Sequence, residues 1–313
     1  MTAQEFSGGT SRSLCGRELS PSAGVLSDSA QDHGNCMRIS IITPSYNQAQ
    51  FLEQTIRSVL AQNYPNLEYI IIDGGSTDGS VDIIRKYEPE LAYWTSEKDG
   101  GQAEAISRGF ARATGQIIGW QNSDDLYLPG ALHAFAKKFT SHPQVNVLMG
   151  GCLWIDERGQ TLRTRRGYPR YYPGQELTHG EALLWGMGHN QPATLFRREA
   201  YLRAGGLDTN LHCCFDYDLL LRLTKDAPAA PLFYPAACFR IHGESKTSRQ
   251  QAIFEQESAE IRHRHRIDAY QPAEREKAIR GYCRKHVWSQ RWMMLKTTLG
   301  LSEIRNLGKA TPS

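Results

Sequence analysis

Apolar and polar residues between positions 38 and 121 follow two alternating patterns. Short apolar runs rich in β-branched residues predict strands, at 38–43, 67–73, 91–96 and 116–121. Between them, apolar residues recur three and four positions apart and predict helices, at 51–62, 80–87 and 101–114. Asn47 stands where it could cap the first helix, with Gln50 three residues later. Strands that alternate with helices are typical of an α/β fold with a mostly parallel central sheet and flanking helices.

The domain organisation follows from where this alternation begins and ends. Residues 1–36 are small and polar and predict a disordered leader. We expect one domain over 37–250, with a parallel half at 37–150 and a less regular half at 151–250. Residues 251–313 predict a helical, basic extension. Elements expected in the second half are a hairpin around 157–159, a strand running into a helix over 193–206, a helix start at 215–224 and a late strand over 231–241.

The composition excludes several classes of protein. With 313 residues, 40% of them hydrophobic, and 36 Lys and Arg against 33 Asp and Glu, the chain is an ordinary globular sequence rather than a disordered or collagen-like one. Its seven cysteines are an odd number without zinc-ligand spacing, which favours a reducing compartment. No apolar run approaches the roughly 18 residues of a membrane span. We therefore expect a cytoplasmic location.

The excess of positive charge is concentrated at the C-terminal end. From Arg262 onward the chain carries 12 Lys and Arg but only four Asp and Glu. Basic and large apolar residues interleave over 280–300, a pattern that fits peripheral contact with the inner face of an anionic membrane. An amphipathic helix packed on the body would give the same pattern. No nucleic-acid partner is expected, because no recognition motif accompanies the charge.

Polar and acidic residues follow the four predicted strands of the first half. In open α/β sheets, ligands bind outside the carboxyl ends of the strands, so these segments are expected to converge on one crevice. Asp73 ends an apolar strand and could bind a nucleobase edge or merely cap its turn. Asp124 and Asp125 are adjacent carboxylates that repel each other unless a cation or hydrogen-bond donors compensate. Mn²⁺ or Mg²⁺ bound to a diphosphate would compensate this repulsion. The alternative is that the carboxylates cap the following helix.

Four motifs stand in register: TPSYNQ at 43–48, IDGGSTDGS at 72–80, SEKDGGQAEAISRGFARATG at 96–115 and NSDDLYLPGAL at 122–132. In this order and with these separations, the chain resembles family 2 glycosyltransferases of the GT-A fold over about 38–250. The resemblance implies that residues 37–250 are a GT-A catalytic domain with a nucleotide-binding and an acceptor-binding half. It also implies an inverting, metal-dependent transfer of one sugar from a nucleoside-diphosphate sugar.

The resemblance assigns roles to individual residues. The implied general base is Asp216, with a plain helix N-cap as the alternative. The implied metal ligands are Asp125 and His242, although a late histidine could equally be structural. The implied donor site comprises Pro44, Tyr46, Asn47, Asp73, Gly75, Ser76, Asp99, Gln102 and Asp124. The implied acceptor side comprises Trp185, His189, Gln191 and Asp218, where a core role for the tryptophan is the alternative.

Two positions depart from the family pattern. Asn122 stands where many relatives have aspartate, and Phe215 stands where many have glutamate before the base. These departures leave open a nucleotide-sugar-binding module without turnover. A sugar-nucleotide nucleotidyltransferase is a second alternative, but it would normally carry a basic Gly-rich loop where this chain has TPSYNQ.

The resemblance also suggests partners. A UDP-sugar is the favoured donor, with GDP- and dTDP-sugars as alternatives. The acceptor is expected to be a saccharide or a lipid-linked saccharide, in surface polysaccharide biosynthesis. Gln290-Arg291-Trp292 lacks the spacing of the Q-x-x-R-W motif of processive relatives, which favours addition of a single sugar.

Overall fold

The computed structural model describes residues 36–163, 170–185 and 190–267, together with scattered positions between 270 and 284. The expected leader and the segment 280–300 therefore lie almost wholly outside the described residues. Cys36, placed at the end of the leader from the sequence, instead contacts the body, and its Sγ lies 3.0 Å from Tyr64 Oη. No helix in the described ranges is both long and apolar enough to cross a bilayer.

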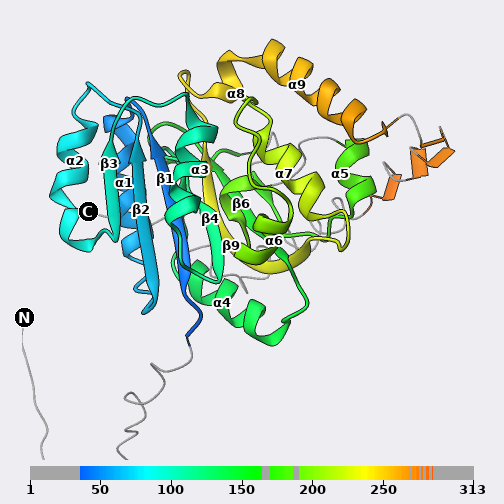
Figure 1. Ribbon diagram of the computed structural model, residues 1–313, viewed down its shortest axis with the longest axis horizontal. Coiled ribbons are helices and arrows are strands. Elements are labelled where there is room, and N and C mark those ends of the chain that lie inside the picture. Colours follow the sequence, from blue (N-terminus) through cyan, green and yellow to red (C-terminus); the bar gives the residue numbers. More distant parts are fainter. Residues whose placement is uncertain are drawn as a thin grey trace, which may run out of the picture. The chain divides into compact units, whose positions relative to one another are not determined.

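Four parallel strands form the first half of the sheet, in the order β3-β2-β1-β4. They are β1 (Ile39–Ser45), β2 (Leu67–Asp73), β3 (Tyr93–Ser96) and β4 (Ile117–Trp120). The helices between them are α1 (Ala49–Leu60), α2 (Ser80–Lys86) and α3 (Gln102–Arg112), with a short 3-10 turn at Glu88–Glu90. These elements confirm the strands and helices predicted from the sequence, and Figure 1 shows their arrangement.

The second half continues the same sheet with mixed strand directions. β4 pairs antiparallel with β8, β8 antiparallel with β6, β6 parallel with β9, and β9 antiparallel with β5. These strands are β5 (Leu126–Tyr127), β6 (Val147–Ile155), β8 (Thr194–Arg197) and β9 (Ala230–Arg240), and β7 (Tyr171–Tyr172) pairs with β6. The helices are α4 (Ala131–Ser141), α5 (His179–Trp185), α6 (Arg198–Arg203) and α7 (Phe215–Leu223), and Gln191–Ala193 forms a 3-10 turn.

Both faces of the sheet are buried. Successive side chains on a strand point to opposite faces, so each strand contributes to two clusters. On one face, Ile42 and Ile70 belong to the cluster that includes Phe110 of α3. On the other, Ile39 and Ile41 belong to the cluster that includes α1. Burial on both faces explains why the first strands read as continuous apolar runs rather than as alternating ones.

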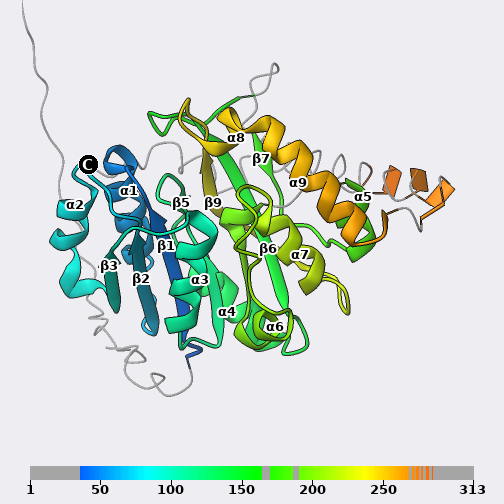
Figure 2. The same ribbon diagram turned by 45° about the horizontal axis from the view of Figure 1, so that its top comes forward.

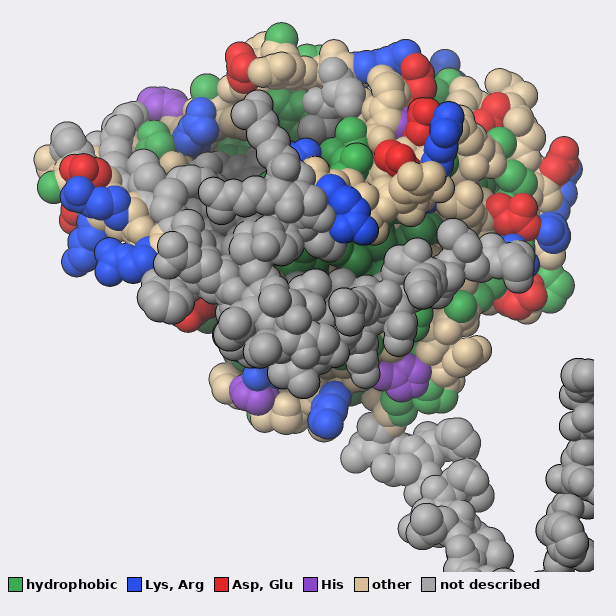
Figure 3. Space-filling view, turned by 180° about the vertical axis from the view of Figure 1, so that it is seen from behind, with side chains coloured by type: hydrophobic (Ala, Val, Ile, Leu, Met, Phe, Trp, Pro, Cys, Tyr) green, Lys and Arg blue, Asp and Glu red, His purple; other side chains and the backbone are tan. Residues whose placement is uncertain are grey.

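Two further helices follow β9, α8 (Lys246–Arg249) and α9 (Gln251–Arg264). In both ribbon views α9 runs beside α7 (Figures 1 and 2). Ile261 of α9 is fully buried in the same cluster as α3 and α7, and Phe254 packs against it. Seen from behind, the described surface carries Lys and Arg side chains interspersed with Asp and Glu (Figure 3).

One local expectation is wrong. Asn47 does not cap α1: the N-cap is Gln48, and no side chain of the N-cap residue makes a capping hydrogen bond. Instead, the Ala49 amide at the start of α1 donates to Asp78 Oδ2 at 2.8 Å. Asn47 adopts a positive φ of 50° and its Oδ1 accepts from the Thr77 amide at 2.9 Å. Its side chain thus ties the loop after β1 to the loop after β2.

Candidate active site at the carboxyl edge of the sheet

The loops that follow the parallel strands meet at one edge of the sheet. The Asn47 amide also donates to Ser76 Oγ at 2.8 Å, so the first two loops are bonded twice. Gly74, after β2, faces the loop after β3: a Cβ at this position would stand 3.1 Å from the carboxylate oxygens of Asp99. A side chain at this position would therefore require the Asp99 carboxylate to shift by a few tenths of an ångström. Tyr46 projects from the same edge with 62% of its surface exposed, whereas Pro44 is buried within β1.

Asp73 is completely buried at the end of β2. Its Oδ2 accepts from the amides of Gly75 at 3.1 Å and Ser76 at 2.8 Å, and from Ser96 Oγ at 2.7 Å. Its Oδ1 accepts from Ser76 Oγ at 2.5 Å. Asp73 therefore organises the loops after β2 and β3, and its role toward a nucleobase stays a prediction.

The loop after β3 is connected to the acidic loop after β4 through amide side chains. Asp99 Oδ1 accepts from the Gly101 amide at 2.8 Å, and burial raises the pKa of this carboxyl. Gln102, at the start of α3, donates from Nε2 to Asn122 Oδ1 at 2.8 Å. Asn122 Nδ2 in turn lies 3.1 Å from Asp125 Oδ2 and 2.9 Å from Gln191 Oε1. Asn122 is thus a neutral bridge inside a hydrogen-bond network.

Asp125 is completely buried and surrounded by fixed donors. Its Oδ1 accepts from the Arg240 amide at 2.8 Å, and its Oδ2 accepts from Asn122. Burial raises the pKa of Asp125 well above its usual range, and the charge of Asp124 adds to the effect. Each Asp125 oxygen accepts one hydrogen bond and keeps a further lone pair. Its predicted role as a metal ligand remains untested.

Asp124 and His242 form the pair that is best placed for a cation. His242 Nε2 lies 2.9 Å from Asp124 Oδ2, and the Asp124 side chain retains 20% exposure. The ring of Phe51 supports the imidazole, with centroids 4.7 Å apart. No group of three or more His, Cys, Asp or Glu side chains in the described ranges could hold a metal alone. A carboxylate and an imidazole suit Mn²⁺ or Mg²⁺ when phosphate oxygens from a substrate complete the shell.

Arg240 holds this acidic loop in place and was not singled out from the sequence. The side chain is completely buried. Its Nε donates to the carbonyl of Asp124 at 2.7 Å, and Nη2 donates to Gln54 Oε1 at 2.9 Å. Nη1 donates to the carbonyls of Asp156 at 3.2 Å and Glu157 at 3.1 Å. The signal in the sequence was an arginine inside the apolar run of β9, because a buried charge needs partners.

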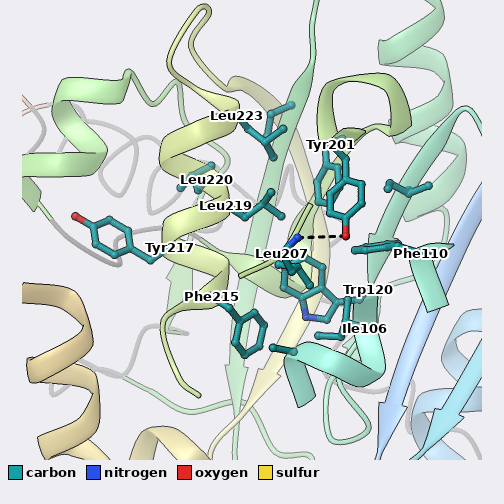
Figure 4. Close-up of a cluster of buried hydrophobic side chains, with 14 of the residues drawn as sticks. Ile106, Phe110, Trp120, Tyr201, Leu207, Phe215, Tyr217, Leu219, Leu220 and Leu223 are labelled. Carbon is teal, nitrogen blue, oxygen red and sulfur yellow. Dashed lines mark hydrogen bonds between the residues drawn. The ribbon is translucent and has the colours of Figure 1, made fainter. Parts of the chain in front are cut away.

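Asp216 lies in the first turn of α7, one residue inside the helix rather than before it. A negatively charged side chain in this turn interacts favourably with the helix dipole. Its neighbour Phe215 packs on Trp120 of β4, with ring centroids 6.2 Å apart (Figure 4). Burial lowers the pKa of Lys246, while the carboxylates of Asp216 and Asp99 both act on it in the opposite direction. The ammonium of Lys246 therefore lies within electrostatic reach of the base candidate and of the loop after β3.

Of the predicted acceptor-side residues, the structure describes the side chains of Gln191 and Asp218. Gln191 is buried and donates from Nε2 to the carbonyl of Trp120 at 3.0 Å. Asp218, two residues on and so about 200° around the helix, is paired with Arg222, whose Nε lies 2.9 Å from its Oδ2. Trp185 ends α5, but its side chain and the whole of His189 lie outside the described residues. An acceptor role for these four residues stays a prediction.

Comparison with known proteins identifies the family. The model of glycosyl transferase family 2 matches residues 40–204, about half of the chain. An uncharacterized glycosyltransferase of Mycobacterium tuberculosis is 42% identical over 190 residues, or 59% of this chain and 68% of that protein. A putative teichuronic acid biosynthesis glycosyltransferase of Bacillus subtilis, TuaG, is 32% identical over 46% of this chain and 56% of that protein. The chain matches as little as 32% of the length of other curated relatives.

Solved structures share the fold. TarS of S. aureus in complex with UDP-GlcNAc superposes with a TM-score of 0.57 at 15% identity, over 80% of this chain and 72% of that one. The mannosyltransferase PcManGT of Pyrobaculum calidifontis, in complex with GDP-Man and Mn²⁺, superposes with a TM-score of 0.55 at 17% identity, over 88% and 84%. These likenesses confirm the mostly parallel sheet with flanking helices that was predicted for this chain. The chain therefore has the GT-A fold and belongs to glycosyl transferase family 2.

Proposed function

We propose that this glycosyltransferase moves one sugar, with inversion, from a nucleoside-diphosphate sugar to a saccharide or lipid-linked acceptor. A UDP-sugar is the favoured donor, and GDP- and dTDP-sugars are alternatives; TarS carries UDP-GlcNAc and PcManGT carries GDP-Man. The name of TuaG supports a place in surface polysaccharide biosynthesis. The observations that support the proposal are the Asp124–His242 pair after β4 and the packing of Phe215, which precedes Asp216, on Trp120 at the end of the same strand.

The donor would lie along this edge. The exposed ring of Tyr46 is available to stack on the base, and Asp73 holds the loop that contains Gly75 and Ser76. Asp99 and Gln102 would border the nucleotide on the side of β3. Asp124 and His242 would hold Mn²⁺ or Mg²⁺ against the diphosphate, and Asp125 would hold the loop after β4 in place. When bound, the cation would offset negative charge on the leaving diphosphate.

Asp216 would act as the general base. Its carboxylate would take the proton of the acceptor hydroxyl while that oxygen forms a bond to the anomeric carbon. The bond from the anomeric carbon to the diphosphate oxygen would break on the opposite face, and the electron pair would leave with the diphosphate. A single displacement of this kind inverts the anomeric configuration.

The test is a donor-cleavage assay with UDP-, GDP- and dTDP-sugars in the presence of Mn²⁺ or Mg²⁺. We expect release of nucleoside diphosphate from at least one donor, and its strong loss in Asp216→Asn with donor affinity preserved. Asp82→Asn, an exposed carboxylate on α2, is the matched control. Pyrophosphate release, cleavage of no donor, or unchanged turnover in Asp216→Asn would each contradict the proposal. The anomeric configuration of the product, read by proton NMR, tests inversion separately.

A further inference from the structure

The side chain of Glu257, on helix α9, is buried against the body of the protein. Of the residues of this helix, Glu257 and Ile261 are the buried ones, at 8% and 0% exposure. Ile261 joins the apolar core, as expected of a helix packed on a domain. Glu257 is different, because a charged side chain is costly to bury unless partners satisfy it. The family model ends at residue 204, so this helix lies beyond the part of the chain that it matches.

The partners of Glu257 are three consecutive backbone amides. Its Oε1 accepts from the amide of His212 at 2.7 Å. Its Oε2 accepts from the amides of Cys213 at 2.9 Å and Cys214 at 2.8 Å. Cys214 is the N-cap of α7, and its own side chain makes no capping hydrogen bond. A carboxylate from α9 therefore fixes the residues that enter α7.

Other contacts hold the same loop to the C-terminal helices. Lys246 Nζ donates to the carbonyl of His212 at 2.9 Å, and Cys213 Sγ lies 2.9 Å from Gln250 Oε1. The loop is thus held through both its amides and a carbonyl. Asp216 follows Cys214 by two residues, so only Phe215 separates it along the chain from the amides that Glu257 binds. The place of the Asp216 carboxylate therefore depends on where Glu257 holds the loop.

We propose that Glu257 is a positioning residue for the general base Asp216, and so that the C-terminal extension completes the active site. This inference rests on the proposed function, in which Asp216 takes the proton of the acceptor. Without the carboxylate, three amides would lose their acceptor at once, and the loop would relax toward other partners. A displacement of about 1 Å in a reacting group can cost on the order of 100-fold in rate. Donor binding would be preserved, because it is proposed to use the loops after β1 to β4 rather than the loop that Glu257 holds.

The test compares Glu257→Gln with Glu255→Gln, an identical change at an exposed position of the same helix. In the full-length chain, we expect Glu257→Gln to lower kcat about 10- to 100-fold, as for a misplaced catalytic group. The dissociation constant of the donor should stay within twofold of wild type. Glu255→Gln should change neither quantity. A merely structural role would lower donor affinity, kcat and melting temperature together, and that result would overturn the proposal.

Hydrogen exchange tests the contact itself without any substrate. The amides of His212, Cys213 and Cys214 should exchange slowly in wild type and faster in Glu257→Gln, while amides in α3 stay unchanged. Unchanged exchange at the three amides, or kcat within twofold of Glu255→Gln, would refute the positioning role. If wild type cleaves no donor, the proposed function fails, whereas the exchange rates still decide whether Glu257 holds the loop.

Discussion

The ring of Phe215 packs against Trp120, with centroids 6.2 Å apart and planes inclined by 41°. Trp120 ends the central strand β4, directly before the acidic loop, and Phe215 is the first residue of α7, directly before Asp216. This apolar contact joins the two parts of the chain on which metal binding and proton transfer are proposed to depend. Phe215 stands where the resemblance leads one to expect glutamate, and its packing holds the start of α7 next to the proposed base Asp216.

The contact predicts the effect of Phe215→Ala. Phe215 is buried to 4% exposure, and truncating a buried phenylalanine costs about 3–5 kcal/mol in the free energy of unfolding. Denaturant unfolding would measure the loss. Phe233→Ala is the control, because Phe233 is 79% exposed and its removal should have little effect. Equal stability of Phe215→Ala and wild type would contradict the packing described.

The Asp124–His242 pair predicts the metal response. Chelation by EDTA should abolish donor cleavage, and added Mn²⁺ should restore it. Asp124→Asn and His242→Ala should each raise the Mn²⁺ concentration that gives half-maximal activity, because each removes one of the two proposed ligands. Asp82→Asn should respond to Mn²⁺ as wild type does. Activity that survives chelation would refute metal dependence.

The contacts of Arg240 predict that Arg240→Lys loses stability although it keeps the positive charge. Lysine cannot reproduce the fork of donors that reaches Asp124, Gln54 and the hairpin carbonyls. Removing one partner from a buried charged network typically costs about 3–5 kcal/mol, so Arg240→Lys should unfold at clearly lower denaturant concentration. Arg85→Lys changes an exposed arginine and should be neutral. A neutral Arg240→Lys would show that the network is dispensable.

The lowered pKa of Asp218 predicts how the free energy of unfolding depends on pH. Burial alone would raise the pKa of Asp218, but hydrogen bonds and charge from His265 and Arg222 outweigh it, and the pKa is lowered. A lowered pKa in the folded state means that the stabilisation is present above the unfolded value of about 3.9 and is lost as pH falls below it. Asp218→Asn should therefore be less stable than wild type at pH 7. The difference should shrink toward pH 3, and a difference independent of pH would contradict the assignment.

The segment 280–300 predicts membrane association that depends on charge. Reversing Arg284, Lys285, Arg291 and Lys296 to glutamate should abolish co-flotation with vesicles that contain anionic lipids, because juxtamembrane basic residues bind such surfaces electrostatically. Vesicles of neutral lipid should recover little of either protein. If wild type and the variant float equally, the membrane prediction fails and an amphipathic helix on the body is favoured.

The sequence allowed the first half of the fold to be predicted in detail. Strands buried on both faces give continuous apolar runs. Helix α3 buries Ala103, Ile106 and Phe110, and its C-cap residue Ala113 is buried too, as the spacing indicated. Local patterns did not disclose long-range polar contacts. Asn47 bonds a loop 30 residues away instead of its own helix, Arg240 reaches Asp124 across 116 residues, and Glu257 reaches His212 across 45. Such contacts depend on the assembled fold rather than on nearby residues.

The most direct test of a single active site at this edge is a crystal structure with Mn²⁺ and a bound nucleoside-diphosphate sugar. We predict the cation on Asp124 and His242, the base beside Tyr46 and Asp73, and the anomeric carbon open to Asp216. A sugar bound elsewhere, or Asp216 directed away from its anomeric carbon, would contradict the account.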